Sequence, residues 1–256
     1  MKLLVLLLSF LIILPISLIA QESGYVTMND SLVLKPSMIF SEEFSDLDDW
    51  IAEQQPGGKV FLNSGKMEIE DKGGCTVWFD KKLVQPVMIE FTASVIDEGG
   101  PQDRVSDLNC FWLATDPWHG DFFGDPHPHR AGKFSQYDSL QLYYVGLGGH
   151  NNTRTRFRRY TGNGQKPLLP AHDLSDEAYL ILPNVPNRIR IIVYNNTIQY
   201  WRNEQLIFNF FDASPYESGY FAFRTVNNHL IIDEFKVYAL SKRGEDFLSK
   251  PKSDNQ

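Results

Sequence analysis

The feature that most constrains the fold of this chain is a succession of short segments rich in β-branched and aromatic residues, each followed by a turn-forming sequence. Such segments are typical of β-strands, and Gly, Pro and Asn mark the connections between them. The segments expected to form strands are 60–62, 66–69, 76–79, 87–95, 110–114, 140–145, 153–160, 188–194, 197–201, 206–210, 219–224 and 230–238. Asn195 and Asn196 separate two of them as a two-residue hairpin turn would. With no convincing amphipathic helix and no internal repeat, the pattern predicts an all-β fold, a sandwich or jelly roll of two antiparallel sheets.

The N-terminus departs from this pattern. Lys2 precedes an almost continuous apolar run at 3–19, and polar residues begin at Gln21. This is the order of a secretory signal, so we expect 1–20 to be cleaved and the mature protein to be secreted or periplasmic. A membrane anchor is the competing interpretation, because the run approaches the roughly 17 residues of a short span. Pro15 near the end of the run and the small residue at its junction favour cleavage, which leaves no stable membrane insertion.

Removal of the signal leaves one expected jelly-roll domain at 21–240 and a polar C-terminal tail at 241–256. The whole chain has 24 Lys and Arg residues against 32 Asp and Glu, a formal net charge of -8. Nonspecific nucleic-acid binding needs a basic surface, so nucleic acid is excluded as the expected partner. One stretch is an exception, because four arginines fall within 154–159.

The two cysteines, Cys75 and Cys110, lie inside expected strands. An exported protein can form a disulfide between them, and two buried free thiols are the equal alternative. Neither cysteine belongs to a zinc-binding spacing, and the histidine-rich loop at 116–134 matches no metal motif. We therefore expect no metal site and no cofactor.

The basic stretch is the clearest functional signal. Side chains alternate between the two faces of a strand, so one face would carry Arg154, Arg156, Arg158 and Tyr160. Neighbouring guanidinium groups repel one another unless an anion or partner carboxylates neutralise them. Arginine binds carboxylate and sulfate groups through two parallel hydrogen bonds, which favours an anionic ligand. A salt-bridged, solvated strand face is the alternative.

A second candidate group precedes the basic strand. Tyr143 and Tyr144 must point to opposite faces, so one faces the core and the other a cleft. His150 lies in the Gly-rich turn that leads into the basic strand. Two hydrolytic mechanisms find no support here, because the chain has neither the paired carboxylates of a retaining glucanase nor a Gly-x-Ser-x-Gly motif.

These strings also carry a family resemblance. The sequences RVSDLNCFW, YYVGLGG, TRFRRY and GYFAFRTVNNH occupy 104–112, 143–149, 155–160 and 219–229. Together they resemble the YesU-like family of concanavalin A-like jelly rolls, which includes dehydratases acting on ulvan oligosaccharides in marine bacteria. The resemblance covers about 39–238 and implies a concanavalin A-like jelly roll of two antiparallel sheets.

The resemblance also implies roles for individual residues. An elimination next to a uronate needs a neutralised carboxylate, a base and an acid. The expected catalytic residues are Arg158 with Arg156 for the carboxylate or a sulfate, His150 or His229 as base, and Tyr144 or Tyr160 as acid. The expected sugar-binding residues are Asn109, Trp112, Arg104, Asn151, Arg154 and Arg224, with Trp112 stacking under a ring.

The resulting functional hypothesis is a carbon–oxygen lyase, either an oligosaccharide dehydratase or a polysaccharide lyase. Its substrates would be anionic oligosaccharides that are rich in rhamnose, capped by an unsaturated uronosyl group and, in some cases, sulfated, such as ulvan fragments. The alternative is a noncatalytic glycan-binding module that uses the same groove without proton transfer.

Overall fold

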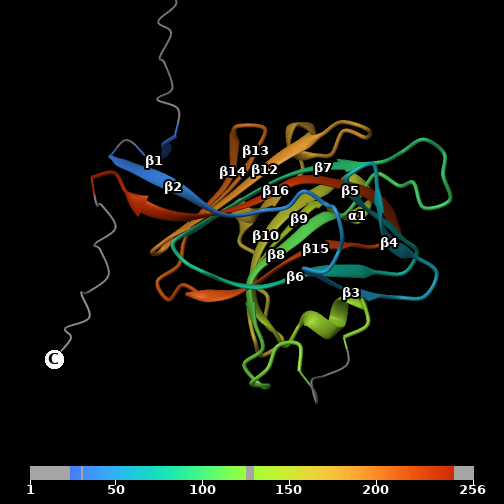
Figure 1. Cartoon of the computed structure of the whole chain (residues 1–256), viewed down its shortest axis with the longest axis horizontal. Helices are drawn as coiled ribbons and strands as arrows, with labels where there is room; N and C mark the ends of the chain where they lie inside the picture. Colours follow the sequence, from blue (N-terminus) through green and yellow to red (C-terminus); the bar gives the residue numbers. More distant parts are fainter. Residues whose placement is uncertain (1–23, 30, 125–129, 245–256) are drawn as a thin grey trace, which may run out of the picture.

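A computed structural model describes residues 24–29, 31–124 and 130–244 of this chain (Figure 1). The signal predicted at 1–20 lies outside the described residues, as does the predicted tail from 245 onward. The all-β prediction is confirmed, since strands dominate the described part. The last strand continues to Lys242, two residues into the segment predicted to be a polar tail.

Sixteen strands form in the described part. Their bounds are β1 Val26–Asn29, β2 Leu32–Ser41, β3 Trp50–Gln54, β4 Lys59–Asn63, β5 Lys66–Asp71, β6 Cys75–Val84, β7 Val87–Val95, β8 Leu108–Thr115, β9 Gln141–Gly148, β10 Arg154–Thr161, β11 Asp173–Leu174, β12 Asn187–Tyr194, β13 Thr197–Arg202, β14 Gln205–Phe211, β15 Ser218–Thr225 and β16 Asn228–Lys242. Four short helical turns connect them: η1 Phe134–Tyr137, α1 Gly149–Asn152, η2 Pro170–His172 and η3 Glu177–Tyr179. Within the described residues no helix has the length and hydropathy of a membrane span.

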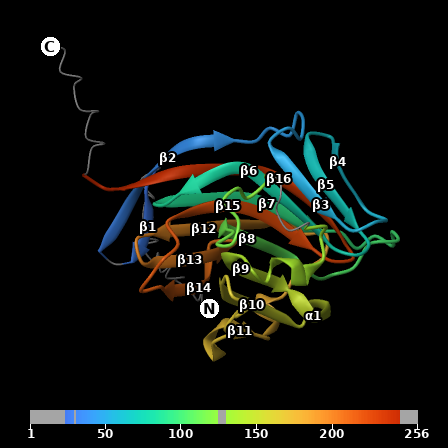
Figure 2. The same ribbon diagram turned by 90° about the horizontal axis from the view of Figure 1, so that it is seen from below.

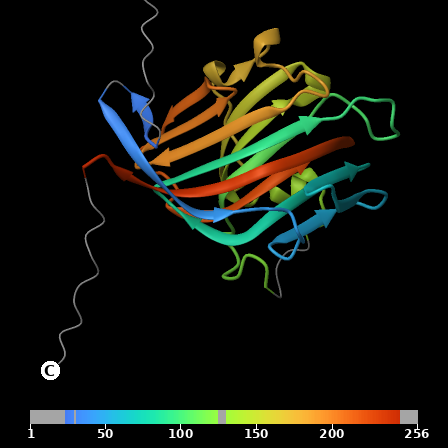
Figure 3. The same ribbon diagram turned by 45° about the horizontal axis from the view of Figure 1, so that its top comes forward.

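The strands form two antiparallel sheets that face each other, as predicted (Figure 1). The seven-stranded sheet has the order β11-β10-β9-β8-β15-β6-β3. The nine-stranded sheet has the order β1-β2-β16-β7-β12-β13-β14, and β5 and β4 extend from β16. The long strand β16, red in Figure 3, pairs with β2, β5 and β7. The hairpin predicted at Asn195 and Asn196 joins β12 to β13.

The main core lies between the two sheets and follows from alternating side chains. In β7, Ile89, Phe91 and Ala93 point into this core, while Glu90 and Thr92 between them are only partly buried. Burial of each large apolar side chain stabilises the fold by about 1.5–3 kcal/mol.

Trp112 belongs to this core, so its predicted role in stacking under a sugar ring is wrong. Its side chain is fully buried and its ring lies 5.8 Å from that of Tyr143 and 6.0 Å from that of Phe157, measured between centroids. The physical reason is that side chains alternate between the two faces of β8. Trp112 shares the inner face with Cys110, whereas Phe111 occupies the outer face.

The outer face of the seven-stranded sheet is covered in part by the connection between β8 and β9. Phe122 and Tyr137 from this connection pack on Trp78 of β6 and, with Phe111 of β8, form a second apolar cluster. The covering segment leaves the part of the face around β9 and β10 uncovered, and this is where the candidate site lies.

The two cysteines are free and buried, so the disulfide alternative is wrong. Cys75 pairs with Thr225 and Cys110 with Phe223, which places β15 between the two cysteine strands. Burial raises the pKa of both thiols. Both side chains therefore act as small apolar groups of the core.

Asp212, which follows β14, is buried and supports a pH-dependent prediction. Its carboxylate accepts hydrogen bonds from the Tyr143 hydroxyl at 2.7 Å, from Arg159 Nε at 2.6 Å and from the backbone N–H of Ser214 at 2.9 Å. Burial alone would raise the pKa of Asp212, but these donors outweigh it, and the pKa lies below its usual value of 3.8.

We expect Asp212→Asn to lower the free energy of unfolding by about 2–4 kcal/mol at neutral pH, because hydrogen bonds to a charged group are lost. A carboxyl group with a lowered folded-state pKa stabilises the fold above its unfolded pKa, and this stabilisation disappears as the pH falls through the folded pKa. The difference between variant and wild type should thus shrink below a pH of about 3.8. Urea unfolding at pH 7 and pH 3 measures this difference in stability, with exposed Asp48→Asn as control. An equal difference at both pH values would contradict the assignment.

Candidate functional site

The candidate site is a pocket of about 500 Å³ on the outer face of the seven-stranded sheet. It lies over β9 and β10 beside the turn α1, which sit together at the lower edge of the molecule in Figure 2. Its charged and polar lining residues are Arg104, Asp107, Tyr144, His150, Asn151, Arg154, Arg156, Arg158, Tyr160 and Lys166. Phe134 and Val226 are the large apolar contributors.

Strand β10 forms one wall of the pocket in the predicted way. Arg154, Arg156 and Arg158 line the pocket together with Tyr160, while Phe157 points to the opposite side and enters the core. The two-residue period of the strand alone explains this row of guanidinium groups.

Two of the pocket arginines have carboxylate partners. Arg156 Nε donates to Asp173 Oδ1 at 2.8 Å, and this hydrogen bond is the main reason that the pKa of Asp173 lies below its usual value. Arg104 Nη2 donates to Asp107 Oδ2 at 2.5 Å. Within the described residues, Arg154 and Arg158 form no ion pair, so the pocket keeps an excess of positive charge.

The tyrosines divide between the two faces as predicted. Tyr143 lies in the core, where it donates to Asp212, and Tyr144 lines the pocket. Burial raises the pKa of Tyr144 well above its usual value, and burial likewise raises the pKa of Tyr160, in both cases against the opposing effect of Arg158. Both hydroxyls therefore stay protonated at neutral pH and can donate hydrogen bonds. The Tyr160 hydroxyl has no hydrogen-bond partner among the described residues.

His150 lies on a left-handed turn at the rim of the pocket. The φ angles of His150, Asn151 and Asn152 are 55°, 57° and 57°, a conformation in which asparagine and histidine are more frequent than other non-glycine residues. His150 Nε2 lies 2.6 Å from Arg156 Nη1. A guanidinium group can only donate, so Nε2 accepts and the proton of the neutral ring is on Nδ1.

Hydrogen bonds to residues outside the turn hold it beside the pocket. Arg104 Nη1 donates to Asn151 Oδ1 at 2.6 Å, and the side-chain amide of Asn152 donates to Ile181 O at 2.8 Å. Arg104 also donates to two backbone carbonyls, those of Val226 and Asn227. The loop before β8 and the turn before β10 are thereby fixed together.

Besides Trp112, three predicted site residues are not brought into the pocket. Asn109 and Arg224 are almost fully buried, because the segment at 130–137 covers this part of the sheet. The Arg224 guanidinium lies 5.2 Å from the ring centre of Phe134 and donates to Thr76 Oγ1 at 3.1 Å. His229 lines a different pocket. The expectation that Asn109 and Arg224 contact sugar is therefore wrong, and His229 does not lie in the pocket of the β10 arginines.

Asp107, Lys166 and Phe134 are among the lining residues that the sequence analysis did not name as site residues. Asp107 lies within the string RVSDLNCFW, but its partner Arg104 was the residue singled out. Lys166 follows a turn containing Gly162 and Gly164 that brings the chain back beside β10, where Arg158 Nη1 donates to its carbonyl at 2.5 Å. That pair of glycines is a signal that could have located it. Phe134 had no such signal.

The chain matches one known protein family. The profile of a family described as a domain of unknown function, DUF6250, matches residues 69–235. This span includes most strands of both sheets and most of the residues that line the pocket. No curated protein matches the chain.

Three solved structures share the fold at low sequence identity. A protein of unknown function with a galectin-like fold from Bacillus subtilis has a TM-score of 0.66 and 16% identity, over 82% of this chain and 100% of that one. The endo-β-1,3-glucanase of Pyrococcus furiosus has a TM-score of 0.55 and 10% identity, over 86% of this chain and 99% of that one. The β-glucanase of Bacillus licheniformis has a TM-score of 0.53 and 13% identity, with the same coverage of 86% and 99%. These likenesses confirm the jelly-roll fold.

Proposed function

The chain belongs to the family defined by the domain of unknown function DUF6250, and we propose that its basic pocket binds anionic oligosaccharides and acts on them by elimination, as a carbon–oxygen lyase. The observation that carries the proposal is the meeting of three β10 guanidinium groups with a histidine and two tyrosine hydroxyls in one pocket. The shared fold of the two glucanases supports a carbohydrate as ligand.

The charges of the pocket support a carboxylate or sulfate group on the ligand. Arg154 and Arg158 have no ion-pair partner in the described part of the chain, and Lys166, paired with Asp138 at 2.6 Å, also lines the pocket. An incoming uronate would be bound by paired guanidinium hydrogen bonds, which suit the planar carboxylate. The same groups would stabilise the negative charge that develops when the neighbouring proton is removed.

The elimination itself needs only proton transfers from this chain. On a saturated uronate the base removes the proton from the carbon that bears the carboxylate, and the C–H electrons form a carbon–carbon double bond. On an unsaturated cap that carbon has no hydrogen, so the base removes a proton from the ring carbon next to the one that carries the leaving hydroxyl, and the C–H electrons form a second double bond. The carbon–oxygen bond to the leaving group breaks, and its oxygen takes a proton from the acid. His150 is the base, and Tyr144 or Tyr160, both protonated, is the acid.

The geometry also explains how the base becomes available. In the free protein Arg156 donates a hydrogen bond to His150 Nε2. A uronate carboxylate is a stronger acceptor for a guanidinium group than an imidazole is. Binding of the substrate would draw Arg156 toward the carboxylate and free the Nε2 lone pair of His150.

Hydrolysis by a glucanase mechanism fits this pocket less well. Retaining glycosidases use two carboxyl groups about 5–5.5 Å apart. Among the described lining residues Asp107 is the sole carboxylate, and Arg104 and Ser106 already donate to it. Elimination needs no such pair.

The substrate class follows from the resemblance to YesU-like proteins. The four strings on which it rests all contribute to this pocket, through Arg104, Tyr144, Arg158 and Val226 among others. Their convergence supports oligosaccharides with an unsaturated uronosyl cap, such as rhamnose-rich ulvan fragments that carry sulfate. A chain with a secretory signal at 1–20 would meet such fragments outside the cytoplasm.

A noncatalytic glycan-binding module is the second candidate. One observation favours it: the lone pair of the proposed base is already hydrogen-bonded to Arg156. If this contact persists when a glycan is bound, the pocket binds without proton transfer.

Incubation with unsaturated ulvan or rhamnogalacturonan oligosaccharides tests the two candidates. Elimination is expected either to remove one water molecule or to cleave the chain, both seen by mass spectrometry, with a change in the ultraviolet absorbance of the unsaturated uronate. Binding by calorimetry without either product would overturn the lyase and support the binding module. Arg158→Ala should weaken binding about 10- to 100-fold, the value of a charged hydrogen bond, whereas Lys82→Ala should not.

Gly146, beside Tyr144 in the pocket, gives a prediction about the position of the acid. A Cβ at Gly146 would lie 2.3 Å from the Tyr144 hydroxyl oxygen, so alanine must displace the phenol. We expect Gly146→Ala to fold and to lower the turnover number by roughly 100-fold, the cost of misplacing a reacting group by about 1 Å. Steady-state kinetics measure this.

Gly149 provides the matched control for that variant. It lines the same pocket, and a Cβ there would meet no atom closer than 3.8 Å. Gly149→Ala should keep near wild-type turnover. Equal kinetics for the two alanine variants would show that the position of the Tyr144 hydroxyl does not matter.

A further inference from the structure

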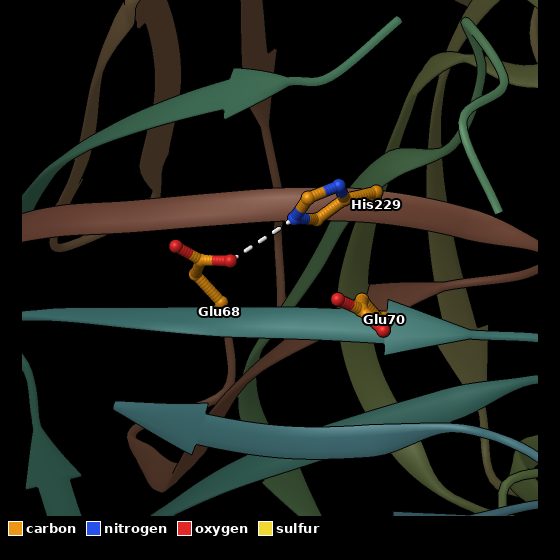
Figure 4. A group of neighbouring side chains, drawn as sticks. All are labelled: Glu68, Glu70 and His229. Carbon is orange, nitrogen blue, oxygen red and sulfur yellow. Dashed lines mark hydrogen bonds and ion pairs between the residues drawn. The ribbon is translucent and has the colours of Figure 1, made fainter. Parts of the chain in front are cut away.

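A second group of titratable side chains lies outside the pocket. Glu68 and Glu70 of β5 lie beside His229 of β16 (Figure 4), and each of the three offers one ligand atom within 4.8 Å of the other two. Glu68 Oε2 and His229 Nε2 are 3.2 Å apart. The proposed elimination makes no use of this group.

Strand alternation explains why these side chains meet. In β5, Met67 and Ile69 enter the core, so Glu68 and Glu70 must point to the outer face of the nine-stranded sheet. His229 lies directly opposite Glu70 in the antiparallel pairing of β5 with β16. The three side chains thus share one face by register.

The hydrogen bonding of His229 is compatible with a metal-bound ring. Its Nε2 faces Glu68 at 3.2 Å, and its Nδ1 faces Asp103 Oδ1 at 3.1 Å. Carboxylates only accept, and a neutral imidazole has one N–H. Either the ring carries two protons, or Nδ1–H donates to Asp103 and Nε2 binds a metal ion. A carboxylate behind the ring is the usual arrangement around a metal-bound histidine.

The carboxylates around His229 have few cationic partners, although Asn63 Nδ2 donates to Glu68 Oε1 at 2.7 Å. The side chains of Glu68 and Asp103 are only 9% and 5% exposed, and within the described residues their sole ion-pair partner is His229. Glu70 has Lys59 at 3.3 Å, on the solvent side. Buried carboxylates of this kind are costly unless they are paired or coordinate a metal.

An orphaned oxygen in the adjoining pocket adds independent support. This pocket, of about 240 Å³, is lined by Glu70, Glu98, Gln102, Asp103 and His229 among others. The side-chain oxygen of Gln102 has no solvent contact and no hydrogen-bond donor in the described part of the chain. A buried acceptor without a donor, in a pocket lined by three carboxylates, suits a hydrated cation.

We propose that Glu68, Glu70 and His229 bind a divalent transition-metal ion of the zinc class, with Asp103 as the hydrogen-bond acceptor of His229. Imidazole with carboxylates suits zinc, whereas calcium takes oxygen ligands alone. Two ligands at about 2.1 Å from a tetrahedral zinc ion lie about 3.4 Å apart, close to the separation of Glu68 and His229. Glu70 would complete the set by turning from Lys59, and water would take the fourth position.

The ion would have a positioning role. Asp103 Oδ2 accepts the backbone N–H groups of Glu98 and Gly100, so it organises the loop between β7 and β8. The next residue along the chain is Arg104, which lines the substrate pocket. A metal ion that fixes His229 and Asp103 would therefore also fix the backbone at Arg104.

Zinc titration of the chelator-treated full-length protein tests the site without any oligosaccharide, so its outcome is separate from that of the proposed lyase activity. We expect one zinc ion to bind by calorimetry and to raise the melting temperature, because a ligand of the folded state stabilises it. Glu68→Gln and His229→Gln should bind zinc at least tenfold more weakly and lose the rise in melting temperature. Calcium should produce neither effect.

His119→Gln is the matched control, because it removes a histidine that faces Asp116 at 3.0 Å elsewhere. It should bind zinc like the wild type. The proposal is overturned if zinc leaves the melting temperature of the wild type unchanged, or if folded Glu68→Gln, checked by circular dichroism, binds zinc as tightly as the wild type does.

Discussion

His150→Asn should reduce the turnover number on unsaturated uronosyl oligosaccharides by roughly 100- to 10,000-fold, the usual contribution of a general base. Asparagine tolerates the positive φ of 55° at this position, so the left-handed turn and the fold should persist. It has no ring nitrogen to accept the proton. Substrate affinity should change little, because Arg154 and Arg158 remain.

Single-turnover kinetics and calorimetry separate these two effects. His119→Asn, outside the pocket, is the control and should keep full activity. Should His150→Asn turn over substrate at the wild-type rate, His150 is not the base. A parallel loss of affinity and turnover would instead assign it to substrate binding.

Trp112→Ala should lower the free energy of unfolding by about 3–5 kcal/mol, the cost of a large cavity in a packed core. The side chain is 0% exposed and packs between the two sheets, with the ring of Tyr200 at 6.4 Å. Urea unfolding followed by circular dichroism measures the loss.

Trp118→Ala is the matched tryptophan control. Its side chain is 67% exposed, and its Nε1 donates to Gly162 O at 2.7 Å. Loss of that single hydrogen bond should cost about 1 kcal/mol. If Trp112→Ala were no more destabilising than Trp118→Ala, the placement of Trp112 in the core would be wrong.

The comparison of Trp112 with the basic strand shows what a sequence pattern can determine. In β10, charged and apolar residues alternate, so the period of two fixes which side chains face the pocket. In β8, seven consecutive residues are buried, because the connection between β8 and β9 covers the outer face. Alternation is then invisible in the sequence, and the face of Trp112 could not be inferred.

Non-local pairing explains the other differences. His229 and Glu68 are 161 positions apart, and only the register of β5 against β16 brings them together. No short motif encodes such a contact. Strand β2 was missed for a local reason: it contains Pro36, which lowers the strand signal although it is compatible with a strand.

The apolar cover on the seven-stranded sheet limits what the pocket can process. Phe134, whose ring centre lies 5.7 Å from that of Tyr144, stands where the open part of the face meets the covered part. A polysaccharide lying across the sheet would meet this barrier. Under the proposed lyase function, a substrate would therefore enter with one end in the pocket. Acting in that way, the protein would shorten fragments that endo-acting enzymes release, and it would not move along a polymer.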